Sequence, residues 1–224
     1  MKTAIILAGG TGTRLKGVTK TPKPLIEISK SISMLEYQII WLSDFCDEII
    51  VACNEDVYKK VNSTFAKLCP QVKYSIEKEK LGTGGALKKA LLFNRDNYVY
   101  VCNCDDILIT DSYDPHDLID DAYKGASILL SKPMLRFGKV TLNKLGEVLK
   151  FKEKPELKIW VSAGHYAFKP KKVLRYLPDK GDLELQALQY LADKKMLRGL
   201  KYTNGLWIPI NNYKDVIRIR GLLK

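Results

Sequence analysis

Short apolar runs alternate with amphipathic stretches in the first half of the chain, and this alternation constrains the fold more than any other sequence feature. Four runs are predicted to be buried strands and three stretches to be helices, in the order strand 4–8, helix 35–45, strand 48–53, helix 57–68, strand 72–76, helix 84–93 and strand 98–104. Such repetition is typical of a parallel sheet covered by helices. We therefore expect an α/β fold with a doubly wound, mostly parallel, Rossmann-like sheet, and ligands beyond the carboxyl ends of its strands.

The second half has a different pattern, because short strands follow one another between Pro or Gly turns. We expect strands at 126–130, 139–142, 148–152 and 160–168, helices at 171–177 and 183–195, a strand pair across Asn204-Gly205, and a last helix at 213–223. The four strands predict an antiparallel or mixed extension of the sheet. Since 224 residues suffice for one sizeable core and no linker interrupts them, we expect a single domain, 1–224.

Charge and cysteine content narrow the classes of partner. The net charge of +12 admits nucleic acid, but it suits equally an enzyme whose substrates are phosphates. The lysines are spread without a long run, so we expect neither nucleic acid nor membrane as the partner, and an RNA-binding protein remains an alternative. The five cysteines lack the paired spacing of a zinc site. With no secretory signal or membrane span at the start, we expect a soluble, cytoplasmic protein with reduced cysteines.

A glycine-rich turn, Gly9-Gly10-Thr11-Gly12-Thr13-Arg14, follows the first strand. Glycines let backbone N–H groups approach a polyphosphate, and an arginine offers a planar pair of donors to its oxygens. The spacing breaks the dinucleotide-binding pattern at its last glycine and lacks the Lys-Ser/Thr of a Walker loop. The alternative is a tight turn that binds no ligand.

A lysine between two prolines, in Thr21-Pro22-Lys23-Pro24-Leu25, follows this turn. Prolines restrict the backbone on either side, so the lysine is presented at low entropic cost. Together the two segments resemble the start of the sugar-phosphate nucleotidyltransferase family, also called nucleotide-sugar pyrophosphorylases. The resemblance implies a nucleotide site made by Leu7, Ala8, Gly9, Gly10, Gly12, Thr13, Arg14 and Lys23, in which Arg14 holds the β and γ phosphates and Lys23 faces the α phosphate.

The segment Leu81-Gly82-Thr83-Gly84-Gly85-Ala86 resembles the second glycine-rich segment of that family, which implies that Gly82 and Thr83 bind the nucleotide. The family's base-reading side chain stands five residues before the first glycine, and here it is Glu77. A carboxylate only accepts hydrogen bonds, so it suits the adjacent N–H donors of guanine. Glu77 therefore favours GTP, and the alternative is an exposed charge at the end of a strand.

The segment Val101-Cys102-Asn103-Cys104-Asp105 resembles the family's strand that ends in Asn-Gly-Asp, whose aspartate binds catalytic Mg²⁺. The resemblance assigns Asp105 to the metal and to catalysis, although Cys104 replaces the usual glycine. Asp106 ranks second, as a ligand or a helix cap. A carboxylate at the carboxyl end of a central strand can hold Mg²⁺ against phosphate oxygens.

The sugar-side residues come from three further matches. Glu153-Lys154-Pro155 and the stretch 161–168 resemble the family's Glu-Lys-Pro and Asn-Ala-Gly-x-Tyr-x-Phe pair, although Ser162 replaces the asparagine. Phe137-Gly138-Lys139-Val140 matches another glycine on the sugar side. The resemblance implies that Glu153 binds a sugar hydroxyl, that Lys154 binds the sugar phosphate, and that Gly138 and Gly164 lie against the sugar.

The second metal ligand is the least regular feature of the sequence. Guanylyltransferase members read Trp-x-Asp-Ile where this chain reads Trp207-Ile208-Pro209-Ile210, and Pro209 has no side-chain ligand atom. The uridylyltransferase version of the motif places an asparagine at Asn211 instead. We therefore predict Asn211 as the second ligand, an uncharged oxygen that Mg²⁺ accepts.

The resemblance covers nearly the whole chain and implies transfer of a nucleotidyl group to a sugar 1-phosphate, with release of pyrophosphate. Its closest match is to the guanylyltransferases for heptose 1-phosphate and mannose 1-phosphate. We expect a nucleotide-binding half at about 1–110 and a sugar-phosphate half at about 111–224, with Mg²⁺ as the cofactor. A UTP- or dTTP-dependent enzyme and a non-catalytic nucleotide-binding regulator are the alternatives; the sequence leaves the oligomeric state open.

Overall fold

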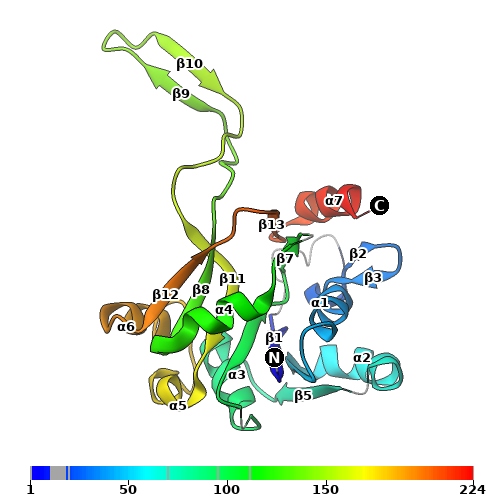
Figure 1. Cartoon of the computed structure of the whole chain (residues 1–224). Coiled ribbons are helices and arrows are strands. Elements are labelled where there is room, and N and C mark those ends of the chain that lie inside the picture. Colours follow the sequence, from blue (N-terminus) through cyan, green and yellow to red (C-terminus); the bar gives the residue numbers. More distant parts are fainter. Residues whose placement is uncertain are drawn as a thin grey trace.

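A seven-stranded sheet crosses the centre of the protein in our computed structural model (Figure 1), which describes residues 2–10, 19, 21–69, 71–94, 96–110 and 112–223, with the side chains of 62–68 outside this description. The strand order is β12-β8-β11-β6-β1-β4-β5. The strands are β1 (Thr3–Leu7), β4 (Glu48–Asn54), β5 (Val72–Glu77), β6 (Val99–Asn103), β8 (Ala126–Ser131), β11 (Val161–Phe168) and β12 (Leu197–Lys201).

The strand directions make the sheet mixed but mostly parallel. Strand β1 is parallel to β4 and β6, β4 is parallel to β5, and β12 is parallel to β8. Strand β11 alone runs the other way and pairs antiparallel with both β6 and β8. This arrangement confirms the predicted fold class. It also places the carboxyl ends of β1, β5, β6 and β8 at one edge of the sheet.

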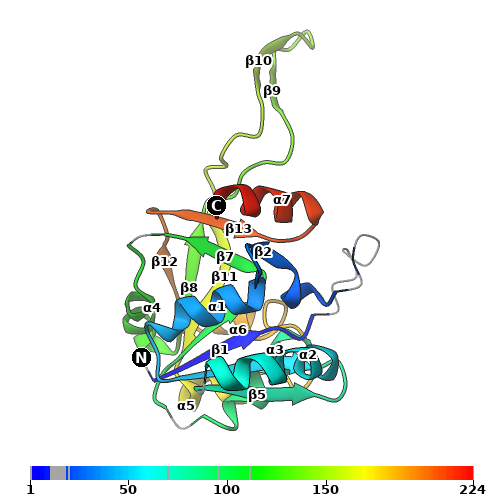
Figure 2. The same ribbon diagram turned by 90° about the vertical axis from the view of Figure 1, so that its right-hand side faces the viewer.

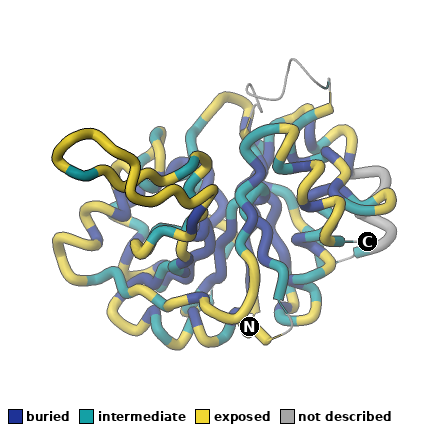
Figure 3. The backbone as a smooth tube through the Cα atoms, turned by 90° about the horizontal axis from the view of Figure 1, so that it is seen from above, coloured by how far each residue is buried: buried dark blue, intermediate teal, exposed yellow. Residues whose placement is uncertain are grey.

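Helices cover both faces, because β1 alternates its apolar side chains between two cores. Ala4 and Ile6 belong to one buried cluster and Ile5 and Leu7 to the other. The first cluster packs under α1 (Met34–Ser43), α2 (Glu55–Leu68), α4 (Pro115–Asp121) and α7 (Tyr213–Leu222). The second packs under α3 (Gly82–Leu91), α5 (Pro170–Val173) and α6 (Ala187–Asp193). Figure 3 shows the buried strands in the centre of the body and exposed segments around them.

Local sequence signals set the helix starts that matter for the site. Helix α1 begins after Ser33, whose hydroxyl accepts from the Glu36 N–H, while the Glu36 carboxylate accepts from the Ser33 N–H. This capping box satisfies two backbone donors that the helix cannot pair internally.

Two predicted helices of the second half differ from the structure. The predicted helix at 183–195 is shorter than expected, since α6 begins at Ala187. The region at 171–177 is the short helix α5 followed by the 3-10 turn η4 (Leu174–Tyr176).

A projecting hairpin corrects one prediction about the second half. Strands β9 (Lys139–Leu142) and β10 (Val148–Lys152) pair only with each other among the described residues. Figures 1 and 2 show this hairpin extended well away from the body. The expected extension of the sheet is therefore made by β8, β11 and β12. Every residue of both strands is exposed, so neither strand has a face packed on the body.

The strands on either side of Asn204-Gly205 do not form the predicted pair. Strand β12 pairs with β8, whereas β13 (Leu206–Pro209) pairs antiparallel with β7 (Asp106–Ile109), a strand that the sequence reading missed. Two contacts direct the chain towards β7: the Tyr202 hydroxyl donates to the Ile109 carbonyl at 3.1 Å, and Thr110 Oγ1 donates to the Asn204 carbonyl at 3.1 Å. The turn thus carries the chain from one sheet to another.

Three other features of the fold complete the description. A small antiparallel pair, β2 (Glu27–Ser29) and β3 (Ile32–Ser33), precedes α1, and a 3-10 turn, η3 (Ala122–Lys124), follows α4. All five cysteines are free, and Cys102 and Cys104 are buried, as predicted. Within the described ranges, no helix has both the length and the apolar character that crossing a membrane requires.

Candidate active site

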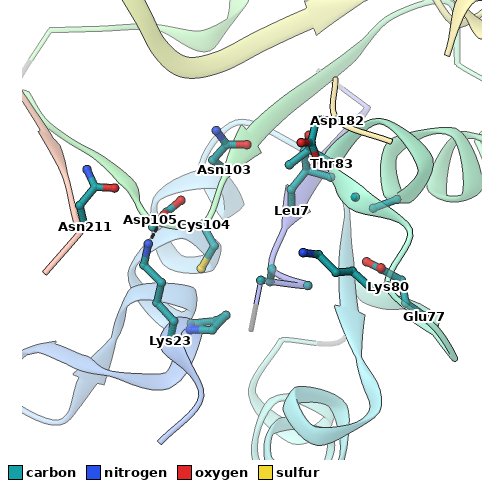
Figure 4. A pocket seen from close by; sticks show the side chains of 16 residues that line it. Leu7, Lys23, Glu77, Lys80, Thr83, Asn103, Cys104, Asp105, Asp182 and Asn211 are labelled. Carbon is teal, nitrogen blue, oxygen red and sulfur yellow. Dashed lines mark hydrogen bonds and ion pairs between the residues drawn. The ribbon is translucent and has the colours of Figure 1, made fainter. Parts of the chain in front are cut away.

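A cavity of about 420 Å³ opens at the carboxyl edge of the sheet (Figure 4). Strand β1 and its following turn, the β5–α3 turn, the end of β6 and the Pro-Lys-Pro segment surround it. Its lining residues are Leu7, Ala8, Gly9, Gly10, Lys23, Pro24, Glu77, Lys80, Gly82, Thr83, Ala86, Asn103, Cys104, Asp105, Asp182 and Asn211. Segments far apart in the sequence therefore meet where the fold class predicts a ligand.

The first glycine-rich turn approaches the cavity from the end of β1. A Cβ at Gly9 would lie 2.4 Å from Glu77 Oε1, so no larger residue fits there without moving the carboxylate. Gly10 faces open space. The predicted residues Gly12, Thr13 and Arg14 lie outside the described residues.

Glu77 is buried at the end of β5 and is not the exposed charge that the alternative predicted. Its side chain is only 6% exposed. The backbone N–H of Leu81 donates to Oε2 at 3.2 Å, whereas Oε1 has no hydrogen-bond partner within the described part of the chain. Burial raises the pKa of the Glu77 carboxyl, and the Leu81 hydrogen bond and the charge of Lys89 partly oppose that rise. A buried acceptor without a partner at a cavity wall suits a ligand that donates hydrogen bonds.

The second glycine-rich segment forms the start of α3. Gly82 has a left-handed φ of +76°, and a Cβ there would lie 2.5 Å from the Gly181 carbonyl oxygen, so glycine is required for two independent reasons. The Thr83 hydroxyl accepts from the Leu183 N–H and donates to Glu184, each at 2.8 Å. The segment is thereby fixed against the loop that precedes α6.

Lys23 and Asp105 meet across the cavity from Glu77. Lys23 is the first residue of the 3-10 turn η2 (Lys23–Leu25), and Pro24 beside it is buried. The Lys23 ammonium forms an ion pair with the Asp105 carboxylate, shown as a dashed line in Figure 4. The Asp105 side chain is 37% exposed and the Lys23 side chain 17%, so both charges remain accessible from the cavity.

The two adjacent aspartates have different surroundings. Asp106 does not line the cavity, and its carboxylate accepts from Asn103 Nδ2 at 3.0 Å and from Trp207 Nε1 at 2.9 Å. Burial, and then the negative charge of Asp105, raise the pKa of Asp106. A Cβ at Gly164 would lie 1.9 Å from Asp106 Oδ2, so that glycine makes room for this carboxylate. The structure thus favours Asp105 over Asp106 as a ligand-facing residue.

Two buried donors converge on the backbone carbonyl of Asp106. Gln38 Nε2 donates to it at 3.0 Å, and the His165 Nε2–H donates to it at 2.8 Å. The Tyr100 hydroxyl donates to His165 Nδ1 at 2.8 Å, which leaves the imidazole neutral with both nitrogens satisfied. Burial lowers the pKa of His165 to about 4. These contacts anchor the turn that presents Asp105.

The donor set around Asp105 fits Mg²⁺. Asn211 lines the cavity with Asp105, and the Ile210 N–H donates to the Asp105 carbonyl at 2.8 Å, which ties the two segments together. Pro209 does not line the cavity and pairs with Asp106 in the β13–β7 register. The described residues contain no cluster of three acidic, histidine or cysteine side chains that could hold a metal. A carboxylate and an amide oxygen match the few protein ligands by which Mg²⁺ is held beside substrate phosphates.

The predicted sugar-side residues lie apart from the cavity lining. Gly138, Glu153 and Lys154 cluster at the base of the β9–β10 hairpin: a Cβ at Gly138 would lie 3.1 Å from Glu153 Oε2, and Lys154 Nζ lies 3.9 Å from Glu153 Oε1. Both charged side chains are at least 60% exposed. The hairpin leaves the body after β8, at the same edge of the sheet as the cavity. Gly164 is instead buried in β11, behind Asp106.

Several lining residues were not predicted. The sequence motifs assign no ligand contact to Asn103, Lys80 or Asp182. Lys80 stands between Glu77 and Gly82 in the sequence, so its position beside two predicted contacts was an available signal. Asp182 comes from a loop 100 residues after the segment it faces, and no local pattern marks it.

Comparison with known proteins gives consistent matches. A family model described as nucleotidyl transferase matches residues 3–215. The mannose-1-phosphate guanylyltransferase catalytic subunit beta of Drosophila pseudoobscura pseudoobscura is 29% identical, over 96% of this chain and 60% of that protein, so the chain spans about 60% of this relative's length. The D-glycero-alpha-D-manno-heptose 1-phosphate guanylyltransferase of Campylobacter jejuni subsp. jejuni is 36% identical, over 67% of this chain and 68% of that protein. The crystal structure of HddC from Yersinia pseudotuberculosis complexed with GMP-PN has a TM-score of 0.74 at 25% identity, and the match covers all of both chains.

Proposed function

Because the chain belongs to the nucleotidyl transferase family, we propose that it transfers the GMP group of GTP to a sugar 1-phosphate and releases pyrophosphate. The observation that carries this proposal is the arrangement of the cavity. A buried carboxylate lies on one side, with an acceptor atom that has no partner among the described residues, and the Lys23–Asp105 pair lies on the other. A nucleotide has a base at one end and a phosphate chain at the other, so its site needs different groups at its two ends.

The reaction is an in-line attack by an oxygen of the sugar phosphate on the α phosphorus of GTP, with pyrophosphate as the leaving group. The nucleophile is already an anion, so the protein has to position two polyanions and neutralise developing charge. Lys23 faces the α phosphate, Arg14 holds the β and γ phosphates, and Lys154 holds the sugar phosphate. Mg²⁺ held by Asp105 and Asn211 would supply further positive charge at the phosphates.

Glu77 supports guanine as the base. Guanine presents two neighbouring N–H donors on its Watson–Crick edge, and an ionised carboxylate is an acceptor-only group. Oε2 accepts from the Leu81 N–H, and Oε1, which has no partner in the described part of the chain, lies against Gly9, which follows β1. The similarity to proteins named guanylyltransferases also supports guanine as the base.

The acceptor site is proposed on the β9–β10 hairpin. Glu153 and Lys154 lie together near its base and are exposed, and the hairpin follows β8, whose carboxyl end lies at the edge of the sheet on which the cavity opens. For Lys154 to hold the sugar phosphate at the α phosphorus, the hairpin has to approach the cavity when the acceptor binds. Its connections to β8 and β11 lie outside the main sheet, so such a movement would leave the seven-stranded sheet intact.

The test is a matrix of four nucleoside triphosphates against several sugar 1-phosphates, scored by Mg²⁺-dependent pyrophosphate release. We expect release with GTP and at least one sugar 1-phosphate, and none with GTP alone. Retention of nucleotide without any release would instead indicate the non-catalytic regulator.

Asp105→Asn tests the proposed metal site. The substitution preserves the shape of the side chain but removes one charge from the proposed Mg²⁺ site, so we expect turnover to fall by orders of magnitude while the circular dichroism spectrum is unchanged. Near-normal turnover at low Mg²⁺ would contradict the role given to Asp105.

A further inference from the structure

Lys80 is a second cation in the cavity wall, separate from the Lys23–Asp105 pair. It belongs to the turn between β5 and α3, three residues after Glu77, and it lines the same cavity. Figure 4 shows its side chain extending from the Glu77 side towards the middle of the cavity. Lys80 has no hydrogen-bond or ion-pair partner in the part of the chain that the structure describes, whereas Glu79 beside it is paired with Lys180 at 2.8 Å. The Lys80 ammonium is therefore available to a ligand.

The position of Lys80 relates it to the base end of a nucleotide. Lys23, Asp105 and Asn211 lie on the other side of the cavity, where the proposed function puts the phosphates and the metal. Glu77, at the end of β5, and Lys80, in the β5–α3 turn, face them. A donor and an acceptor thus face the cavity from one end, and the Lys23 cation stands at the other with the oxygens of the proposed metal site.

The edge of guanine matches this donor and acceptor. Its N1–H and N2–H donors lie beside the O6 acceptor, so a carboxylate and an ammonium can be satisfied by one base. Adenine presents an amino donor where guanine has O6. An ammonium would face that amino group as donor against donor, which disfavours ATP as well as favouring GTP.

We propose that Lys80 is a specificity-determining residue that donates a hydrogen bond to O6 of guanine while Glu77 accepts from N1–H and N2–H. The proposal rests on the proposed function and deepens it by assigning a second reader of the base. It predicts that selection for the oxo group at position 6 and selection for the N–H donors depend on different residues.

The test compares Lys80→Ala with Lys78→Ala, a matched control. Lys78 is an exposed lysine of the same turn, and it does not line the cavity. Equilibrium binding without sugar phosphate, and kcat/KM with it, are measured for GTP, for ITP, which keeps O6, for ATP, and for 2-aminopurine riboside triphosphate, which lacks O6. A hydrogen bond to a charged donor predicts a loss of about tenfold to a hundredfold.

We expect Lys80→Ala to lower the affinity and kcat/KM for GTP and ITP by that factor, and to leave those for 2-aminopurine riboside triphosphate and ATP unchanged or improved. Lys80→Arg should lose less than Lys80→Ala. Lys78→Ala should leave all four nucleotides unchanged. An equal loss for every nucleotide would show that Lys80 contacts phosphate, and no loss would show a solvated side chain; either overturns the proposal. Guanine-selective binding that depends on Lys80 but yields no pyrophosphate would overturn the proposed function alone.

Discussion

At the scale of single residues, burial decides what Glu77 can do. The carboxylate is almost fully enclosed, one oxygen is held by the Leu81 N–H, and the other lacks a partner among the described residues. Gly9 leaves room for that second oxygen, because a Cβ there would lie 2.4 Å from it. A buried polar atom without a partner costs free energy, and a base with two donors would recover it.

Glu77→Gln tests this account of base selection. The amide can present a donor to a donor of guanine, so we expect kcat/KM for GTP to fall by roughly tenfold to a hundredfold, from a hydrogen bond worth on the order of 1.5–3 kcal/mol. The Mg²⁺ dependence should not change, because the proposed metal ligands, Asp105 and Asn211, are separate from Glu77. A wild-type preference for UTP or dTTP, or an unchanged nucleotide ranking in the variant, would contradict guanine reading by Glu77.

The raised pKa of Glu77 predicts a pH dependence of GTP binding. Burial favours the protonated carboxyl, so Glu77 loses its charge at a higher pH than an ordinary glutamate as the solution is acidified. A protonated carboxyl accepts less well from the guanine donors. Binding of GTP, measured by calorimetry, should therefore begin to weaken at a higher pH than it would with an ordinary glutamate, and Glu77→Gln should abolish this weakening.

His165 predicts a pH dependence of stability. Its pKa is about 4 in the folded protein and near 6.5 when exposed, so the unfolded chain binds more protons between these values. The free energy of unfolding should fall by about 3 kcal/mol through this residue as the pH drops from 6.5 to 4. Asp106 acts in the opposite direction, since its raised pKa adds stability as the pH falls. The free energy of unfolding in urea should therefore be measured against pH for the wild type and for His165→Gln, and the difference between the two should be taken. Equal pH profiles would contradict the lowered pKa of His165.

At the scale of elements, the β9–β10 hairpin stands out because it lacks a covering layer. Val148 pairs with Leu142 and Phe151 with Val140, and these four apolar side chains are 45–63% exposed. The intervening pairs, Lys150 with Thr141 and Lys152 with Lys139, are polar and alternate with them. The hairpin therefore combines apolar and basic side chains in the part of the chain assigned to the sugar phosphate.

Lys154→Ala tests the role of this hairpin. Lys154 is proposed to contact only the acceptor, so we expect the KM for sugar 1-phosphate to rise much more than the KM for GTP. Lys158→Ala is the control, because Lys158 is an exposed lysine of the same connection outside the predicted motif. Equal losses for both substrates, or an equal effect of the control, would show that only the general charge of the hairpin matters.

At the scale of the whole molecule, the two sequence halves share one sheet. Strand β11 from the second half pairs with β6 from the first, and one buried cluster contains Ala4 and Ile6 together with Ile208 and Val216. A core that both halves need favours a single cooperative unit, as the predicted single domain requires.

Thermal unfolding tests whether the chain unfolds as one cooperative unit. We expect one transition, with coincident midpoints for tryptophan fluorescence and far-ultraviolet circular dichroism. GTP with Mg²⁺ should raise the midpoint of the whole transition, because a ligand of the folded state stabilises everything that unfolds with it. Two separated transitions, of which GTP shifts only one, would indicate two independent units.

The sequence alone determined the features that depend on local periodicity and short motifs. The alternation of apolar and amphipathic segments predicted the strands and helices of the first half, because a strand buried under helices on both faces needs a continuous apolar run. The residues Gly9, Lys23, Glu77, Gly82 and Asp105 were predicted from motifs, and the fold brings them to one cavity.

Tertiary structure alone decided which segments became neighbours. Strand β13 pairs with β7 rather than β12, since contacts of Tyr202 and Thr110 direct the chain there, and no local pattern encodes a partner about 100 residues away. The separation of Asp105 from Asp106 likewise depends on Trp207 and Gly164, which approach from other strands. Pairing and burial are set by packing between distant segments, whereas periodicity and motifs are properties of one segment; this is why the sequence indicated the candidate residues and the fold decided their surroundings.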